Sequence, residues 1–108
     1  MKPRRGEVWW VNLDPTRGSE IRKTRPCVVM GTDVLNERRR TVVVIPLSTA
    51  PQHAPPLLVP VAFSGKRAVA VVDQIRAVAK ERLHRCVGEL SAGDLLAVEE
   101  GLRTVLEL

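Results

Sequence analysis

The stretch of sequence that decides the fold is Thr41-Val42-Val43-Val44-Ile45. Four β-branched apolar residues in succession strongly favour an extended backbone, because their branched side chains restrict χ1 and pack well on a pleated surface. Successive side chains of a strand point to opposite faces, so an unbroken apolar run predicts that both faces are buried. We therefore expect a central strand here, with other strands on its two sides.

Shorter apolar segments surround this strand and are bounded by Gly, Pro and polar residues. Pro26 and Pro60 lack a backbone N–H, which predicts that Pro26 stands at the start or edge of its strand and that Pro60 lies in an edge strand. Residues 36–40 are predicted to form a polar turn, and residues 80–83 a helical turn. The segments predicted as strands are 6–13, 26–30, 57–61, 68–72, 75–78 and 86–88.

The hydrophobic period changes to that of a helix near the C-terminus. Ser91 can cap this helix, and Asp94 three residues later makes a weak capping box because it stands where Glu is usual. Gly101 is expected to weaken the helix by about 1 kcal/mol relative to Ala. The apolar stripe consists of Leu95, Val98, Leu102 and Val105.

The order of these elements limits the topology. Several strands follow one another without the crossover segments of about a dozen residues that parallel pairing needs. The sequence therefore predicts a mainly β fold, in which an antiparallel sheet is closed or curled into a small barrel and covered by the C-terminal helix. With 108 residues we expect a single domain over residues 1–108.

The composition excludes several classes of protein. An apolar fraction of 44% is too high for a disordered chain. No apolar run approaches the roughly 20 residues that span a bilayer, so no membrane association is expected. The N-terminus does not look like a secretory signal, and two cysteines do not suggest a disulfide scaffold, so we expect a cytoplasmic protein.

The formal net charge of +5 lies entirely in the first forty residues, which carry ten basic and five acidic groups; the remainder carries seven of each. Two segments, 17–25 and 37–40, concentrate this charge. A basic surface of this kind favours a polyanionic partner, although solvated charged loops are the common alternative. Aromatic residues make up only 3% of the chain, which argues against a protein that stacks successive bases on its side chains.

Common catalytic and metal motifs are missing. The chain has no Gly-rich phosphate loop and no G-x-S-x-G. Cys27, His53, His84 and Cys86 do not have the spacing of a zinc site, so neither a metal nor a cofactor is expected. What remains is an arrangement of arginine, hydroxyl and carboxylate groups, which suits phosphodiester chemistry: arginine binds phosphate, a hydroxyl donates to it, and a carboxylate accepts a proton.

Longer motifs make these residues specific. The blocks Arg5-Gly6-Glu7-Val8, Gly18-Ser19-Glu20 followed by Arg25-Pro26, Ile45-Pro46-Leu47-Ser48-Thr49 and Asp73-Gln74-Ile75-Arg76 occur in this order. In these blocks the chain resembles the MazF/PemK family of toxin endoribonucleases from about residue 5 to the C-terminus. Each block alone would be weak, but together they are specific.

The resemblance implies a partly open SH3-like barrel of the CcdB/MazF type. It also implies a homodimeric toxin that cuts single-stranded RNA at short sequences without a metal. The ribose 2′-hydroxyl would attack the adjacent phosphate and leave 2′,3′-cyclic phosphate and 5′-hydroxyl ends. The partners implied are RNA and a cognate antitoxin protein.

The resemblance also assigns roles to residues. Arg25 matches the catalytic arginine, whose roles are acid–base help and phosphate stabilisation, and the permanent charge of a guanidinium favours the electrostatic role. Ser48 stands where threonine is usual, with Thr49 as the alternative hydroxyl, and Glu20 is a candidate base. Val71 replaces an arginine found in some members, and Ser19 replaces a histidine. The residues expected to contact RNA are Arg17, Ser19, Arg22, Lys23, Thr49, Asp73 and Gln74.

Two other functions are compatible with the same scaffold. One is a non-catalytic relative or a toxin that inhibits gyrase, as CcdB-type proteins do. The G-S-E, R-P and hydroxyl positions favour the ribonuclease, because a non-catalytic relative need not keep them together. The other is a plain RNA-binding barrel, which the few aromatic residues disfavour.

Overall fold

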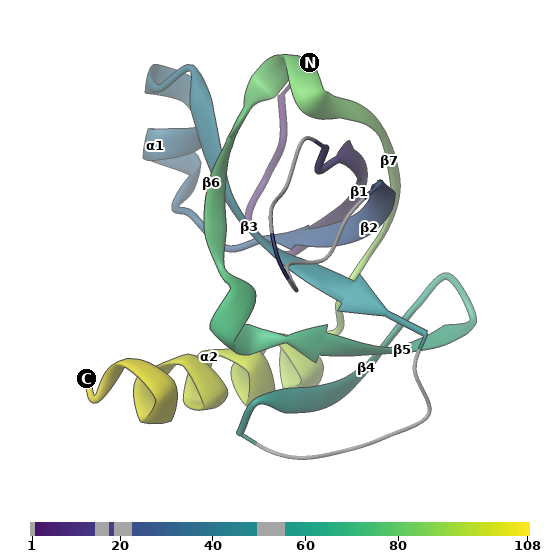
Figure 1. The fold of residues 1–108 in the computed structure, drawn as a ribbon, viewed down its shortest axis with the longest axis vertical. Coiled ribbons are helices and arrows are strands. Elements are labelled where there is room, and N and C mark those ends of the chain that lie inside the picture. Colours follow the sequence, from purple (N-terminus) through teal and green to yellow (C-terminus); the bar gives the residue numbers. More distant parts are fainter. Residues whose placement is uncertain (1, 15–17, 19–22, 50–55) are drawn as a thin grey trace.

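The computed structural model describes residues 2–14, 18, 23–49 and 56–108. Strands interspersed with a few short helical segments precede one long C-terminal helix (Figure 1). The elements are β1 (Glu7–Asn12), β2 (Thr24–Val29), α1 (Asp33–Arg38), β3 (Thr41–Ser48), β4 (Leu58–Phe63), β5 (Lys66–Val71), the 3₁₀ turn η1 (Val72–Gln74), β6 (Arg76–Ala79), the 3₁₀ turn η2 (Lys80–Arg82), β7 (Leu83–Glu89) and α2 (Ala92–Leu106).

β3 is the central strand, as its sequence predicts. The strand order is β4-β5-β3-β2-β1-β7, with β6 also paired to β3, and all pairs are antiparallel. The first part of β3 lies between β2 and β6, whereas Leu47 and Ser48 pair with β5. β3 is thus shared between two curled portions of the sheet, and this forms the partly open barrel expected from the sequence.

The β4–β5 turn closely contacts β7. The hydroxyl of Ser64 donates to the carbonyl of Val87 across 2.8 Å. Gly88 has φ of +154°, and a Cβ there would lie 2.6 Å from the Ser64 hydroxyl oxygen. Only glycine fits this close approach, so the two edges of the sheet can meet through this contact.

The core is divided by β3 into two clusters. Val42 and Val44 face a cluster that includes Trp9, Val11 and Cys27. Ile45 and Leu47 lie in the other cluster, which also holds residues of β4, β5 and α2. The alternation of β3 therefore buries both of its faces, which confirms the prediction made from its unbroken apolar run.

α2 covers the second cluster with its predicted stripe. Val98 is fully buried, and Leu95, Leu102 and Val105 pack against the core. The hydroxyl of Ser91 caps the helix by accepting the Asp94 N–H at 3.1 Å. The Asp94 carboxylate does not complete a capping box as expected; it accepts the backbone N–H of Ala62 in β4 at 2.9 Å, which holds the helix N-terminus against the sheet edge.

Some predicted elements differ from the structure. Residues 36–40 do not form a simple polar turn, because α1 occupies 33–38 and is capped by the hydroxyl of Thr32. Pro26 lies inside β2 and not at its start, but it has the predicted edge position, because β2 pairs only with β1 there and pairing with β3 begins at Cys27. β7 is longer than residues 86–88 and takes in Leu83, which the sequence predicts to be part of a helical turn. Neither α-helix of the described ranges is long and apolar enough to cross a membrane.

Candidate functional site

Arg25 and Ser48 stand near the ends of two neighbouring strands, at the same end of the barrel. The β2–β3 register pairs Cys27 with Pro46, so Arg25 and Ser48 each lie two residues beyond the last such pair. Because side chains alternate along a strand, both residues are on the face of Cys27 and Pro46. Arg25 is exposed and Ser48 half-buried. An arginine and a hydroxyl are thus placed on one face where two neighbouring strands end.

Ser48 and Thr49 differ in their relation to this face. Ser48 is the last residue of β3 and still pairs with Val69 of β5, so its backbone position is fixed. Thr49 follows the strand and is exposed. Strand alternation therefore fixes the face of Ser48 and does not extend to residue 49, which lies beyond β3. Of the two hydroxyls left open by the sequence, Ser48 is the one that shares a face with Arg25.

The connection between β1 and β2 begins beside this end, and its base is firmly bonded. The Leu13 N–H donates to the Lys23 carbonyl at 2.9 Å, and the Lys23 N–H donates to the Asp14 carboxylate at 2.9 Å. Arg82 of η2 donates to the carbonyls of Asn12 and Asp14. Lys23, with φ of +65°, is exposed at this base, two residues from Arg25.

Arg76 is a site residue that sequence reasoning did not select. It opens β6 opposite Val44, on the face of β3 that also carries the Val42 side chain. It is close enough to Cys27 for its charge to act on that thiol. The D-Q-I-R block contains Arg76, but only the cross-strand register shows that it stands on the same face as Arg25.

Cys27 is the buried residue that follows Arg25 on the same face of β2. Its thiol lies 3.7 Å from the Arg25 carbonyl and is fully buried. Burial raises the pKa of Cys27 to about 12, because a thiolate loses its hydration there, and the charge of Arg76 offsets only part of this rise. Cys27 is therefore a neutral packing residue and not a nucleophile.

We expect the two cysteines to react differently with iodoacetamide. At pH 8, Cys86, exposed on β7, should be labelled, and Cys27 should be labelled only after unfolding in guanidinium. In the folded state the Cys27 thiol stays neutral, whereas in the unfolded chain it ionises near pH 9. Its contribution to the free energy of unfolding is therefore complete below pH 9 and is lost as the pH rises from 9 to about 12. Mass spectrometry of labelled peptides gives the result, and rapid native labelling of Cys27 at pH 8 would contradict it.

Asp73 and Gln74 lie apart from the Arg25 end. Since Ser48 pairs with Val69 and Val44 with Arg76, η1 lies opposite the middle of β3. Val72 of this turn packs toward Gly101 of α2. Asp73 is exposed and Gln74 half-buried. The contact of these two residues with RNA stays a prediction.

Four other predicted residues, Arg17, Ser19, Glu20 and Arg22, fall outside the described residues, as does His53. In the part of the chain that the structure describes, no group of three or more His, Cys, Asp or Glu side chains could hold a metal ion.

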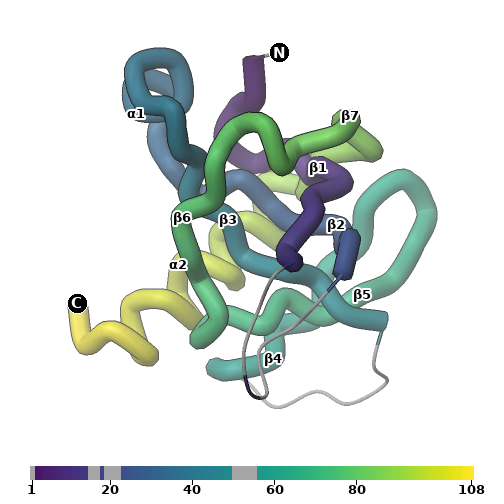
Figure 2. The backbone as a smooth tube through the Cα atoms, turned by 45° about the horizontal axis from the view of Figure 1, so that its top comes forward, coloured from purple at the N-terminus to yellow at the C-terminus, as the bar shows by residue number. Residues whose placement is uncertain are grey.

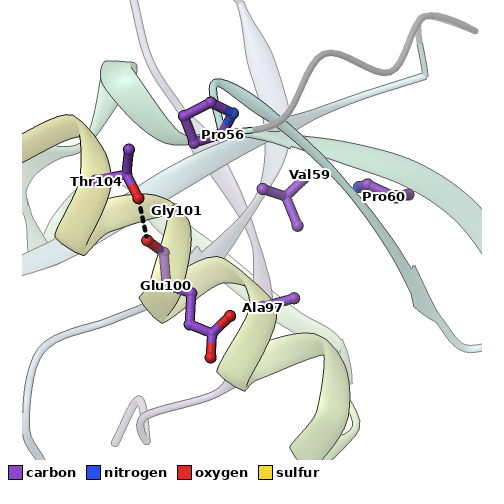
Figure 3. Close-up of a pocket in the computed structure, with 7 residues that line it drawn as sticks. All are labelled: Pro56, Val59, Pro60, Ala97, Glu100, Gly101 and Thr104. Atoms are coloured by element: carbon purple, nitrogen blue, oxygen red, sulfur yellow. Dashed lines mark hydrogen bonds between the residues drawn. The ribbon is translucent and has the colours of Figure 1, made fainter.

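A hollow lies between β4 and α2 (Figure 3). Its lining is mainly apolar, with the Thr104 hydroxyl bonded to the Glu100 carbonyl at 3.1 Å on the helix side. None of the predicted site residues lines it. The lining residues are Pro56, Val59, Pro60, Ala97, Glu100, Gly101 and Thr104.

Comparison with known protein families identifies the family of this chain. Residues 4–106 match the family model described as PemK-like, MazF-like toxin of type II toxin-antitoxin system. The chain belongs to this toxin family. It is 37% identical to a Mycobacterium tuberculosis protein named endoribonuclease MazF9, over 97% of each chain. It is 33% identical to the Escherichia coli endoribonuclease toxin MazF, over 71% of this chain and 68% of that one.

Solved structures of MazF proteins have the same fold. MazF from Deinococcus radiodurans superposes with a TM-score of 0.90 at 23% identity and covers 100% of this chain and 99% of its own. A mycobacterial endoribonuclease in complex with its cognate antitoxin superposes with a TM-score of 0.79 at 22% identity, over 99% and 95% of the two chains. The expected MazF-like barrel is thereby confirmed.

Proposed function

We propose that this toxin-family endoribonuclease cuts single-stranded RNA at short specific sequences without a metal ion, through the ribose 2′-hydroxyl. The observation that carries the proposal is the position of Arg25 and Ser48 on one face at the ends of β2 and β3. Named endoribonucleases among the curated relatives support ribonuclease chemistry over gyrase inhibition.

In this mechanism the 2′-oxygen attacks the adjacent phosphorus while the bond from phosphorus to the 5′-oxygen breaks. Glu20 accepts the proton of the 2′-hydroxyl, and a water molecule from the solvent donates a proton to the departing 5′-oxygen. The products are a 2′,3′-cyclic phosphate and a 5′-hydroxyl. Negative charge grows on the non-bridging oxygens in the transition state, and the Arg25 guanidinium stabilises it with its fixed fork of donors.

Ser48 supplies the second contact to the phosphate. Its hydroxyl donates to a non-bridging oxygen, and its pairing with Val69 keeps it in place during the reaction. Arg17, Arg22, Lys23, Ser19 and Thr49 contact the flanking RNA, as do Asp73 and Gln74. Contacts to phosphates provide affinity and register, whereas sequence choice depends on contacts to the bases.

The experiment is primer extension on a long RNA, incubated with the protein in EDTA. We expect discrete cuts by the wild-type protein, a loss of about 10²-fold in rate for Ser48→Ala, and a change below about threefold for Thr49→Ala. Thr49→Ala is the comparison variant, because it removes the neighbouring hydroxyl, whose proposed contact is with the flanking RNA and not with the reacting phosphate. Uncut RNA at high concentrations of folded wild-type protein would overturn the proposal, and a larger loss in Thr49→Ala would reverse the assignment of the hydroxyl.

We further propose that the chain works as one cytoplasmic domain over residues 1–108 and is inhibited by a cognate antitoxin. A complex of a relative with its antitoxin supports this partner.

A homodimer is also proposed, with exposed Leu96 and Leu106 of α2 in its interface. Sedimentation velocity should give the mass of two chains, and Leu96→Glu should give one; a wild-type monomer at high concentration would contradict the dimer.

A further inference from the structure

The second concentration of positive charge in the sequence lies far from the candidate site. Arg38, Arg39 and Arg40 connect α1 to the start of β3, and Ser48 ends the same strand. At about 3.3 Å per residue, the backbones of Arg40 and Ser48 are separated by about 26 Å along β3. The proposed cleavage chemistry therefore makes no use of these arginines.

Segments from three parts of the chain meet at this end of the molecule. The N-terminal segment, α1 and the β6–β7 connection lie side by side in both views (Figures 1 and 2). The Lys80 N–H donates to the Arg40 carbonyl at 2.9 Å, and Lys2 and Lys80 border one hollow beside α1. We name this the α1 basic surface; it consists of Lys2, Arg38, Arg39, Arg40 and Lys80.

The backbone below this surface is held in place. Asn36 is only 2% exposed, and its amide donates to the Gly31 carbonyl at 3.1 Å. The Arg39 N–H donates to the Leu35 carbonyl at 2.9 Å, which fixes the end of α1. The arginine side chains therefore extend from an ordered turn and not from a loose loop.

The positive charge of the surface is largely uncompensated. Within residues 2–14, 18, 23–49 and 56–108, ion pairs occupy Arg4 with Asp33 and Arg5 with Glu99, but none involves the arginines at 38–40. Asp33 of α1 is already paired with Arg4, and the other acids next to these residues in the sequence are Glu37 and Glu81, so five basic residues stand beside two acidic ones. Like charges held together in this way destabilise a fold unless an anion binds.

We propose that the α1 basic surface is a second RNA-binding site, which holds the phosphate backbone of the substrate outside the segment that is cut. This inference rests on the proposed function. RNA is favoured because it is the substrate class, because arginine forks match phosphate, and because a long strand can reach both ends of β3. Such contacts raise affinity for long RNA without changing the sequence cut.

The test compares two RNAs with the same cut site, one of about 8 and one of about 40 nucleotides. Arg38→Gln/Arg39→Gln/Arg40→Gln should lower kcat/KM on the long RNA about tenfold, mainly through KM, and leave the short RNA unchanged. The slope of log affinity against log salt on long RNA should fall by about 2, as expected for three lost phosphate contacts. Circular dichroism confirms the fold, and Arg38→Gln/Arg40→Gln replaces the triple variant if that variant unfolds.

The matched control, Lys66→Gln/Arg67→Gln/Arg103→Gln, removes three exposed charges elsewhere and should leave both RNAs unaffected. Equal losses on long and short RNA, or equal effects of the two triple variants, would overturn the inference. Loss of poly-L-glutamate binding with unchanged long-RNA cleavage would assign the surface to an acidic polypeptide and overturn it also. If wild-type protein cuts neither RNA, the proposed function fails; anisotropy of labelled long RNA then still decides whether the surface binds RNA.

Discussion

Arg25→Ala is expected to lower kcat/KM for RNA cleavage by about 10³-fold or more, while the protein stays folded. The exposed side chain of Arg25 is not packed in the core, so its removal leaves the fold intact. In the proposed mechanism, however, the transition state then loses the guanidinium that stabilises the charge on phosphate. Arg25→Lys should recover little activity, because a point charge cannot replace two parallel donors.

Two measurements keep this result interpretable. Arg103→Ala removes an exposed arginine of α2 and should leave cleavage unchanged. Initial rates on a short RNA separate kcat from KM, and thermal unfolding verifies that the variant is folded. A folded Arg25→Ala protein that cuts at the wild-type rate would remove Arg25 from the mechanism.

Gly101→Val is expected to destabilise the protein by about 3 kcal/mol, through overpacking between α2 and the sheet. A Cβ at Gly101 would lie 3.0 Å from the Pro56 carbonyl and 3.3 Å from the side chains of Val59 and Val72. Valine adds two further methyl groups to this contact. The melting temperature should fall by roughly 10–20 °C.

Gly93→Val is the matched control on the same helix. No atom lies within 4 Å of a Cβ at Gly93, so this substitution meets open space. Valine has a slightly better helix propensity than glycine, so the free energy of unfolding should stay the same or rise by about 0.3 kcal/mol. Equal melting temperatures for the two variants would show that α2 does not approach the sheet as closely as described.

The core architecture could be predicted because its signals are local. The apolar run of β3 and the period of α2 each specify a buried surface within one segment. α1 was missed since six residues are too short to show a helical period, although Thr32 marks its cap. The strand predicted at residues 86–88 is shorter than β7. The pairing of β7 with β1 shifts register before Trp9 and after Trp10, and these irregularities interrupt the alternation of side chains along β7.

The candidate site could be predicted only in part. The motifs identify Arg25 and Ser48, but that the two share a face follows from the β2–β3 register, which depends on the whole sheet. Arg76 likewise enters the site through its pairing with Val44. Gly101 shows the same limit: as a helix residue it is a weakness, whereas in the fold it allows α2 to approach β4 and η1.

The most direct test of the 2′-hydroxyl mechanism is cleavage of a short RNA in which only the ribose before the scissile phosphate is 2′-deoxy. In EDTA, the all-ribose RNA should be cut to a 2′,3′-cyclic phosphate and a 5′-hydroxyl, and the substituted RNA should stay intact. Cleavage of the substituted RNA at a similar rate, or a 5′-phosphate on the product, would contradict the mechanism.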